Sequence, residues 1–227
     1  MQNKIFCAVD TADVNSAVQL CKQIAPHVGG LKLGMEFFYG CGADGVRRLT
    51  GETWLPFFLD LKLHDIPNTV AQSLKTLLAL KPAIINVHCQ GGPAMLQEAA
   101  DAIAGSTTLL IGVTALTSLD ADDLAAIGTP QQPAALVATL ASLAKRCGLA
   151  GVVCSPLEIG LVRSLWPNAF CVVPGIRPDG SDAIDQKRMS TPKQASDAGA
   201  SVLVIGRPIT AAADPAAAAA AIAASLI

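Results

Sequence analysis

The sequence predicts an α/β protein built as a single (β/α)8 barrel, the TIM-barrel architecture, with one domain covering residues 1–227. Short apolar runs of strand length alternate with longer amphipathic runs from one end of the chain to the other, which is the pattern of repeated βαβ units. The apolar runs contain few polar residues, as expected of strands that are buried on both faces. The length of 227 residues is close to the ~250 residues common in such barrels.

Eight runs have the length and composition of buried strands, and a closed parallel barrel of this class requires eight. The predicted strands are Ile5–Asp10, Gly30–Gly34, Pro56–Leu63, Ala83–Cys89, Thr108–Thr114, Gly151–Ser155, Phe170–Pro174 and Ser201–Gly206.

The amphipathic runs predict the helices of the outer ring. They are Val14–Ile24, Thr69–Leu80, Pro93–Ala104, Pro133–Arg146, Leu157–Leu165, Pro192–Ala198 and Asp214–Ile227. Pro93 and Pro192 suit the first turn of a helix, and Gly148 and Gly199 suit helix ends. Two loops are longer than the barrel needs, Ala115–Gln132 and Gly175–Thr191. Because the loops after the strands build barrel active sites, we expect these two to act as lids or ligand clamps.

The composition excludes several classes of protein. Hydrophobic residues make up 52% of the chain and charged residues 15%, with a net charge of -2, so neither nucleic acid nor an anionic membrane surface is an expected partner. The chain has no signal-peptide pattern and no run of ~18 apolar residues, which predicts a cytoplasmic protein. The seven cysteines include no C-x-x-C pair and are predicted to be reduced and mostly buried.

Charged residues occur at the carboxyl ends of the predicted strands, where barrel enzymes carry their reactive groups. Asp10, Asp60 and Lys62 end predicted strands. Lys32 lies within the second strand, and Arg207 follows the eighth. A single charge at a strand end is more often only solvated. Five that converge on one rim indicate an active site.

The segment Asp60–Asp65 alternates polar and apolar residues. A period of two puts Asp60, Lys62 and His64 on one face of a strand. Buried charges need partners, so we expect Lys62 to lie between carboxylates, with Lys32 as a further partner of Asp60. A lysine held in this way stays protonated, which suits a proton donor better than a Schiff-base nucleophile. The alternative is a purely structural network of ion pairs.

Other polar residues near the predicted rim have two interpretations each. Thr69 either caps the following helix or reaches a ligand. Thr114, Thr117 and Ser118 offer hydroxyls beside the mouth of the barrel, although a threonine there is usually a turn cap. The histidines His64 and His88 are either general acids or hydrogen-bonded support residues.

A phosphate site is predicted between the loops after the seventh and eighth strands, where barrels often bind phosphate. Gly206 lets the backbone approach an anion, and Arg207 can bind phosphate oxygens with two hydrogen bonds. A surface ion pair is the alternative for Arg207. The sequence has no P-loop, no G-x-G-x-x-G motif and no set of residues at metal-ligand spacing, so we expect no cofactor and no metal.

These motifs resemble the type 1 orotidine 5'-monophosphate (OMP) decarboxylase family over nearly the whole chain. The most specific motif is Asp60-Leu-Lys-Leu-His-Asp-Ile-Pro-Asn-Thr69; the others are Ala8–Asp10, Leu31–Gly34, Pro174–Pro178 with Asp185 and Gln186, and Ile205–Pro208. The resemblance implies conversion of OMP to UMP, the last step of de novo pyrimidine biosynthesis, without a cofactor.

The resemblance also implies roles for individual residues. Lys62 donates a proton to C6 of the pyrimidine, and Asp60, Asp65 and Lys32 complete the catalytic array. In a homodimer, Asp65 and Thr69 reach the partner's site. The substrate-binding residues implied are Asp10 and Lys32 for the ribose, Thr117 or Ser118 for the pyrimidine, Arg177, Gln186, Gly206 and Arg207 for the phosphate, and Asp60, Thr69 and Pro174.

Two other functions fit parts of the sequence. A magnesium-dependent sugar-phosphate decarboxylase or aldolase of the same superfamily also carries an Asp-x-Lys-x-x-Asp strand, but His64, the segment Ile66–Thr69 and the loop with Arg177 and Gln186 argue against it. A non-catalytic nucleotide-binding barrel is disfavoured because Asp60, Lys62 and Asp65 are all present.

Overall fold

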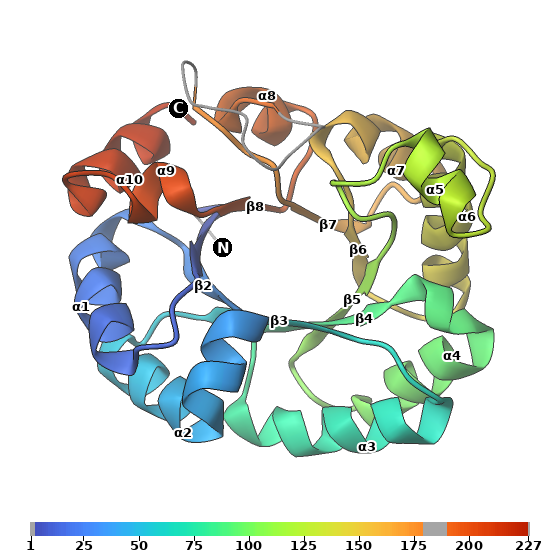
Figure 1. The fold of residues 1–227 in the computed structure, drawn as a ribbon, viewed down its shortest axis with the longest axis horizontal. Helices are drawn as coiled ribbons and strands as arrows, with labels where there is room; N and C mark the ends of the chain where they lie inside the picture. Colours follow the sequence, from blue (N-terminus) through green and yellow to red (C-terminus); the bar gives the residue numbers. More distant parts are fainter. Residues whose placement is uncertain (1–2, 179–189, 227) are drawn as a thin grey trace.

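The computed structural model describes residues 3–178 and 190–226. Eight parallel strands close into a barrel in the order of the chain, from β1 to β8 (Figure 1). They are β1 (Ile5–Val9), β2 (Gly30–Gly34), β3 (Phe57–Leu63), β4 (Ile84–His88), β5 (Leu109–Val113), β6 (Gly151–Val153), β7 (Phe170–Val173) and β8 (Val202–Ile205). All eight predicted strands are therefore confirmed, most of them one or two residues shorter than expected.

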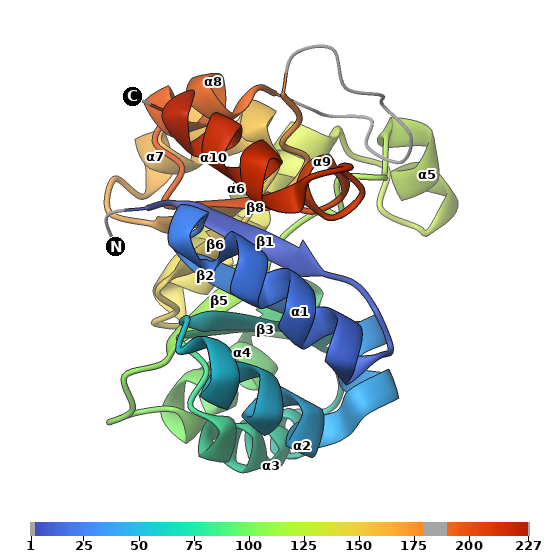
Figure 2. The ribbon, with the colours of Figure 1, turned by 90° about the vertical axis from the view of Figure 1, so that its left-hand side faces the viewer.

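Helices surround the barrel as an outer ring (Figures 1 and 2). The α-helices are α1 (Val14–Ile24), α2 (Met35–Thr53), α3 (Pro67–Leu77), α4 (Gly92–Ala102), α5 (Ala121–Ala126), α6 (Pro133–Arg146), α7 (Ile159–Leu165), α8 (Pro192–Asp197), α9 (Arg207–Thr210) and α10 (Pro215–Ala224). Short 3-10 turns are η1 (Ala25–His27), η2 (Leu78–Leu80), η3 (Cys89–Gly91) and η4 (Pro156–Glu158).

Two apolar cores hold these layers together. Strand residues that point inward fill the barrel, among them Phe6, Phe58 and Ile111. The opposite faces of the strands pack against the helices in a larger core. Helix α1 contributes one apolar face to this larger core, because its buried residues, among them Ala17 and Cys21, recur at helical spacing. The Asp13 side chain caps its first turn.

The sequence did not predict every helix. Helix α2 was missed because it contains several glycines, including Gly42 at φ 63°, where the helix is interrupted. The loop Ala115–Gln132 contains α5, which begins with a capping box at Asp120. The capping interpretation of Thr69 is wrong, since Ile66 is the N-cap of α3 and Pro67 occupies the first turn.

The chemistry of the cysteines matches expectation. All seven are free thiols, and six are buried, with Cys41 intermediate. Within residues 3–178 and 190–226, no cluster of three or more His, Cys, Asp or Glu side chains is arranged to hold a metal ion. The helices in this part of the chain are all too short or too polar to cross a membrane.

Candidate active site

A cavity of about 580 Å³ opens at the carboxyl ends of the strands, within the ~300–1,000 Å³ usual for small-molecule sites. All five charged residues expected at the rim line it: Asp10, Lys32, Asp60, Lys62 and Arg207. Its floor is apolar and includes Phe58, which also packs inside the barrel. Charged groups in this cavity therefore stand above a water-poor surface.

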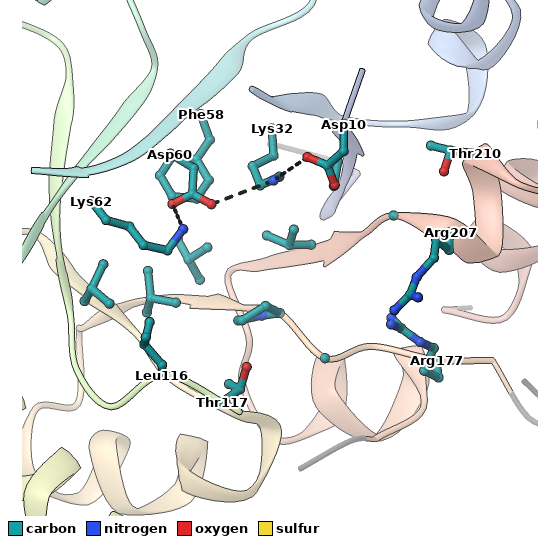
Figure 3. Close-up of a pocket in the computed structure, with 18 of the residues that line it drawn as sticks. Asp10, Lys32, Phe58, Asp60, Lys62, Leu116, Thr117, Arg177, Arg207 and Thr210 are labelled. Carbon is teal, nitrogen blue, oxygen red and sulfur yellow. Dashed lines mark hydrogen bonds and ion pairs between the residues drawn. The ribbon is translucent and has the colours of Figure 1, made fainter. Parts of the chain in front are cut away.

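Four of these side chains form a row of alternating charge (Figure 3). Lys62 Nζ lies 2.8 Å from Asp60 Oδ1, and Lys32 Nζ lies 3.8 Å from Asp60 Oδ2. Lys32 Nζ also contacts Asp10 Oδ1 at 3.0 Å. The side chains of Lys32 and Asp60 are each only 12% exposed. This mutual pairing compensates the removal of the charges from water and limits the rotation of both ammonium groups.

Gly34 makes room for one of these ammonium groups. A Cβ atom at position 34 would lie 2.8 Å from Lys32 Nζ, closer than non-bonded atoms allow. A side chain at position 34 would therefore displace the end of Lys32, and the glycine that ends β2 leaves this ammonium its place beside Asp10.

The strand that carries Asp60 and Lys62 does not keep its regular alternation. Lys62 has φ 51°, in the left-handed region that non-glycine residues rarely adopt, and the pairing of β3 with β4 shifts between Leu59 and Leu63. The prediction that His64 shares the face of Asp60 and Lys62 is wrong: His64 does not line the cavity and instead stacks on His88 with ring centroids 5.3 Å apart.

His88 sits in an environment that disfavours its charged form. Burial, then the neighbouring His64 and Lys62, lower the pKa of His88 to about 4. Its Nδ1 is buried and has no hydrogen-bond partner among the described residues, so the prediction of a hydrogen-bonded support residue is not met at this atom. A neutral imidazole beside Lys62 adds no positive charge that would repel the ammonium.

The opposite end of the cavity is basic (Figure 3). Arg177 and Arg207 lie together there, with Gly206 and Pro174 also lining the wall. The backbone of Arg177 is anchored because its N–H donates to Ser190 O at 3.0 Å. Two guanidinium groups at one end suit a phosphate. Gln186, expected to join them, lies outside the described residues.

The three candidate hydroxyl residues, Thr114, Thr117 and Ser118, lie in different environments. Thr114 is fully buried and its Oγ1 donates to Val153 O at 2.7 Å, so it links β5 to β6. Thr117 lines the cavity, whereas Ser118 is exposed and does not. Thr117 is therefore the hydroxyl that the structure brings to the site. Sequence reasoning also missed Thr210, which lines the cavity near Arg207 (Figure 3).

Asp65 and Thr69 lie away from the cavity of their own chain. Asp65 is exposed, and its Oδ1 accepts a hydrogen bond from the N–H of Ile66 at 2.7 Å. Thr69 lines a separate groove with Tyr39 and other residues. Within the part of one chain that the structure describes, Lys62 is paired with the single carboxylate of Asp60, not with the two expected from the strand pattern.

The buried residue Asn86 was also missed. It is 0% exposed and hydrogen-bonds to both Asp60 and Lys62. The only signal in the sequence was one amide within the apolar run Ala83–Cys89, and a polar residue in such a run needs a buried partner.

The fold and the site together define a (β/α)8-barrel enzyme, with a row of paired charges at one end of its cavity and a basic pole at the other. A family model described as "Orotidine 5'-phosphate decarboxylase / HUMPS family" matches residues 3–222, and the chain belongs to this family.

Curated relatives and solved structures agree with that assignment. The chain is 52% identical over 215 residues to an orotidine 5'-phosphate decarboxylase of Sphingopyxis alaskensis, covering 95% of each chain. It is 50% identical over 226 residues to the enzyme of that name from Novosphingobium aromaticivorans, covering 100% of each. The crystal structure of orotidine 5'-phosphate decarboxylase from Lactobacillus acidophilus superposes with a TM-score of 0.86 at 37% identity, covering 99% of each chain.

Proposed function

We propose that this protein decarboxylates OMP to UMP, the last step of de novo pyrimidine biosynthesis. The observation that carries the proposal is the row Lys62, Asp60, Lys32 and Asp10 at one end of a cavity whose other end holds Arg177 and Arg207. The substrate has the matching polarity, with a pyrimidine carboxylate at one end and a phosphate at the other. Relatives named for this activity at about half sequence identity support the same substrate.

The cavity suggests how the substrate binds. The phosphate lies against Arg177, Arg207 and the backbone at Gly206, with Gln186 as a further ligand. The ribose hydroxyls lie beside Asp10 and Lys32. The pyrimidine then lies over Asp60 and Lys62, with Thr117 and Pro174 on the cavity wall. Binding energy from the phosphate and ribose, far from C6, is available to hold the ring against the charged row.

The chemistry requires stabilisation of a localised carbanion. When carbon dioxide leaves, the electron pair of the C6–carboxylate bond stays in an sp² orbital orthogonal to the ring π system, so the ring offers no electron sink. The fixed ammonium of Lys62 stabilises that charge and then transfers a proton to C6, leaving a neutral amine. Because Asp60 holds the ammonium in place beforehand, little reorganisation is needed during the reaction.

We propose that the active form is a homodimer, in which Asp65 and Thr69 complete the partner's site. The two residues do not line the cavity of their own chain. They lie in a region that exposes large apolar side chains, with Ile66 67% exposed and Tyr39 75% exposed. Burial of this surface against a second copy would stabilise the assembly.

The whole chain, residues 1–227, is taken as one catalytic domain that works without cofactor or metal. The seven free thiols fit the reducing conditions of the cytoplasm, where we place the enzyme.

The alternative is a magnesium-dependent sugar-phosphate decarboxylase or aldolase of the same superfamily. The test is the ultraviolet absorbance of OMP mixed with the purified protein in excess EDTA. Conversion to UMP supports the proposal. A folded protein that converts OMP only with magnesium, or converts pentulose or hexulose phosphates instead, contradicts it, and UMP binding without turnover would identify a non-catalytic nucleotide-binding barrel.

A further inference from the structure

Asn86 connects the backbone of one site residue to the side chain of another. It lies in β4 and is 0% exposed. Its Nδ2 donates to Asp60 Oδ1 at 2.7 Å, and its Oδ1 accepts from the backbone N–H of Lys62 at 2.8 Å. With the amide turned the other way, neither hydrogen bond could form, so the two partners fix its orientation.

The backbone of Lys62 needs this partner because the strand ladder fails beside it. Leu59 pairs with Ile85, but the next pair is Leu63 with Val87, so β3 uses more residues than β4 over the same stretch. Extra residues of this kind leave backbone groups without ladder partners. The Asn86 side chain supplies the missing acceptor for Lys62, whose φ of 51° is strained for a residue with a side chain.

The carboxylate of Asp60 is oriented by the same amide. Asp60 Oδ1 accepts from both Asn86 Nδ2 and Lys62 Nζ, at 2.7 Å and 2.8 Å. The second oxygen, Oδ2, is then turned toward Lys32 Nζ at 3.8 Å. The Asn86 amide therefore positions both the backbone of Lys62 and the Asp60 carboxylate that binds the Lys62 ammonium.

We propose that Asn86 is a positioning residue of the decarboxylation, acting through Lys62 and Asp60 to aim the proton-donating ammonium. Asn86 does not line the cavity and therefore has no direct contact with a bound substrate. The inference rests on the proposed function, since it assigns to Asn86 the geometry that proton transfer by Lys62 requires.

The first variant is Asn86→Asp, which has the same shape. Strand β4 pairs with β3, which carries Asp60 and Lys62, and with β5, which carries no titratable residue. Lys32 of β2 lies beyond Asp60, and His64 stacks on His88 at the end of β4. The new carboxyl would contact Asp60, and such like-charge pairs raise a pKa. Once protonated, the introduced carboxyl can donate to Asp60 and still accept from Lys62, as the amide does. The kcat of Asn86→Asp relative to the unchanged enzyme should therefore rise several-fold between about pH 8 and about pH 5.5.

The second variant, Asn86→Leu, removes both hydrogen bonds at every pH. We expect its kcat to fall at least about tenfold, with UMP affinity changed less than about twofold because the cavity wall is intact. The matched control is Thr108→Val, which removes a buried hydrogen bond of 2.7 Å to Pro82 O outside the site. It should lower thermal stability and leave kcat unchanged.

Three outcomes would overturn the inference: a pH profile for Asn86→Asp parallel to that of the unchanged enzyme, a kcat for folded Asn86→Leu within about twofold of it, or a loss of kcat in Thr108→Val as large as in Asn86→Leu. Assays of OMP turnover by the unchanged enzyme, run in parallel, distinguish failure of the inference about Asn86 from failure of the proposed function. If that enzyme did not turn over OMP, the crystal structure of Asn86→Leu would decide whether Asn86 positions Lys62: release of Lys62 from its left-handed backbone supports the inference, and unchanged Lys62 and Asp60 contradict it.

Discussion

Replacing Lys62 by alanine tests the centre of the proposed mechanism. The change removes the cation 2.8 Å from Asp60 Oδ1. Asp60 keeps Lys32 at 3.8 Å and the donor Asn86 at 2.7 Å, so its carboxylate is not left without partners. We therefore expect Lys62→Ala to fold and to bind UMP, which makes a loss of turnover interpretable.

The size of the loss follows from two effects. A unit charge ~4 Å from a localised carbanion is worth ~4 kcal/mol at an effective dielectric of ~20, or about a thousandfold in rate. Loss of the positioned proton donor removes a further ~10²–10⁴-fold. Together they predict that kcat falls at least about 10⁵-fold in Lys62→Ala.

Lys62→Arg separates the two effects. Arginine keeps the positive charge but holds its proton too tightly to donate it. If both effects operate, Lys62→Arg keeps the stabilising charge and loses the proton donor, so its kcat should fall by about 10²–10⁴-fold, less than in Lys62→Ala. Lys22→Ala is a suitable control, because Lys22 forms an exposed ion pair with Glu52 on the outer helices.

The assay follows the absorbance of OMP in excess EDTA at saturating substrate, with UMP affinity measured separately. Turnover by Lys62→Ala within about a hundredfold of the unchanged enzyme, with UMP bound normally, would refute the role of Lys62 as proton donor.

Three further predictions concern the phosphate, the half-buried His88 and the dimer. Arg207→Ala should weaken UMP binding by about 10- to 100-fold, the value of a charge-assisted hydrogen bond, and leave uridine binding unchanged; calorimetry with both ligands checks this, and equal losses for the two would contradict a phosphate contact. The pKa of His88 is lowered to about 4 from the ~6.5 of an unfolded chain, so the stability it contributes is complete above about pH 6.5 and is lost as the pH falls toward about 4. Urea unfolding at both ends of that range should show a smaller acid loss in His88→Phe, whereas an identical loss would argue against the shift. When inactive Lys62→Ala and Asp65→Ala chains are dissociated and reassociated together, half of the dimers should be hybrids with one complete site of two. The mixture should then recover about a quarter of the activity of the unchanged enzyme. No recovery in hybrids isolated by affinity tags would contradict the shared site.

The barrel was predictable because its causes are local. Strands buried on both faces must be nearly all apolar, and the helices between them must be amphipathic, so β2 and α1 were located with correct bounds. Helix α2 was not, because its glycines lower helix propensity and tertiary packing of Phe37, Val46 and Leu49 compensates.

The gathering of Asp10, Lys32, Asp60, Lys62 and Arg207 also followed from the sequence, because the carboxyl ends of parallel strands meet at one rim. The distances between these side chains could not be predicted from the sequence. Side chains alternate between the two faces of a strand only where its pairing with the next strand is regular. The register of β3 against β4 shifts beside Lys62, so the alternation ends there and His64 stacks on His88.

The sequence by itself thus determined the barrel, the chemical types at its rim and the family resemblance, since each depends on residue types at fixed spacings along the chain. Only the tertiary structure decided that Asn86 links Asp60 to Lys62, that Thr117 and not Ser118 lines the cavity, and that Asp65 lies outside the cavity of its own chain. Such contacts join residues from different strands and loops, and their geometry depends on strand register and backbone strain, which a linear pattern does not specify.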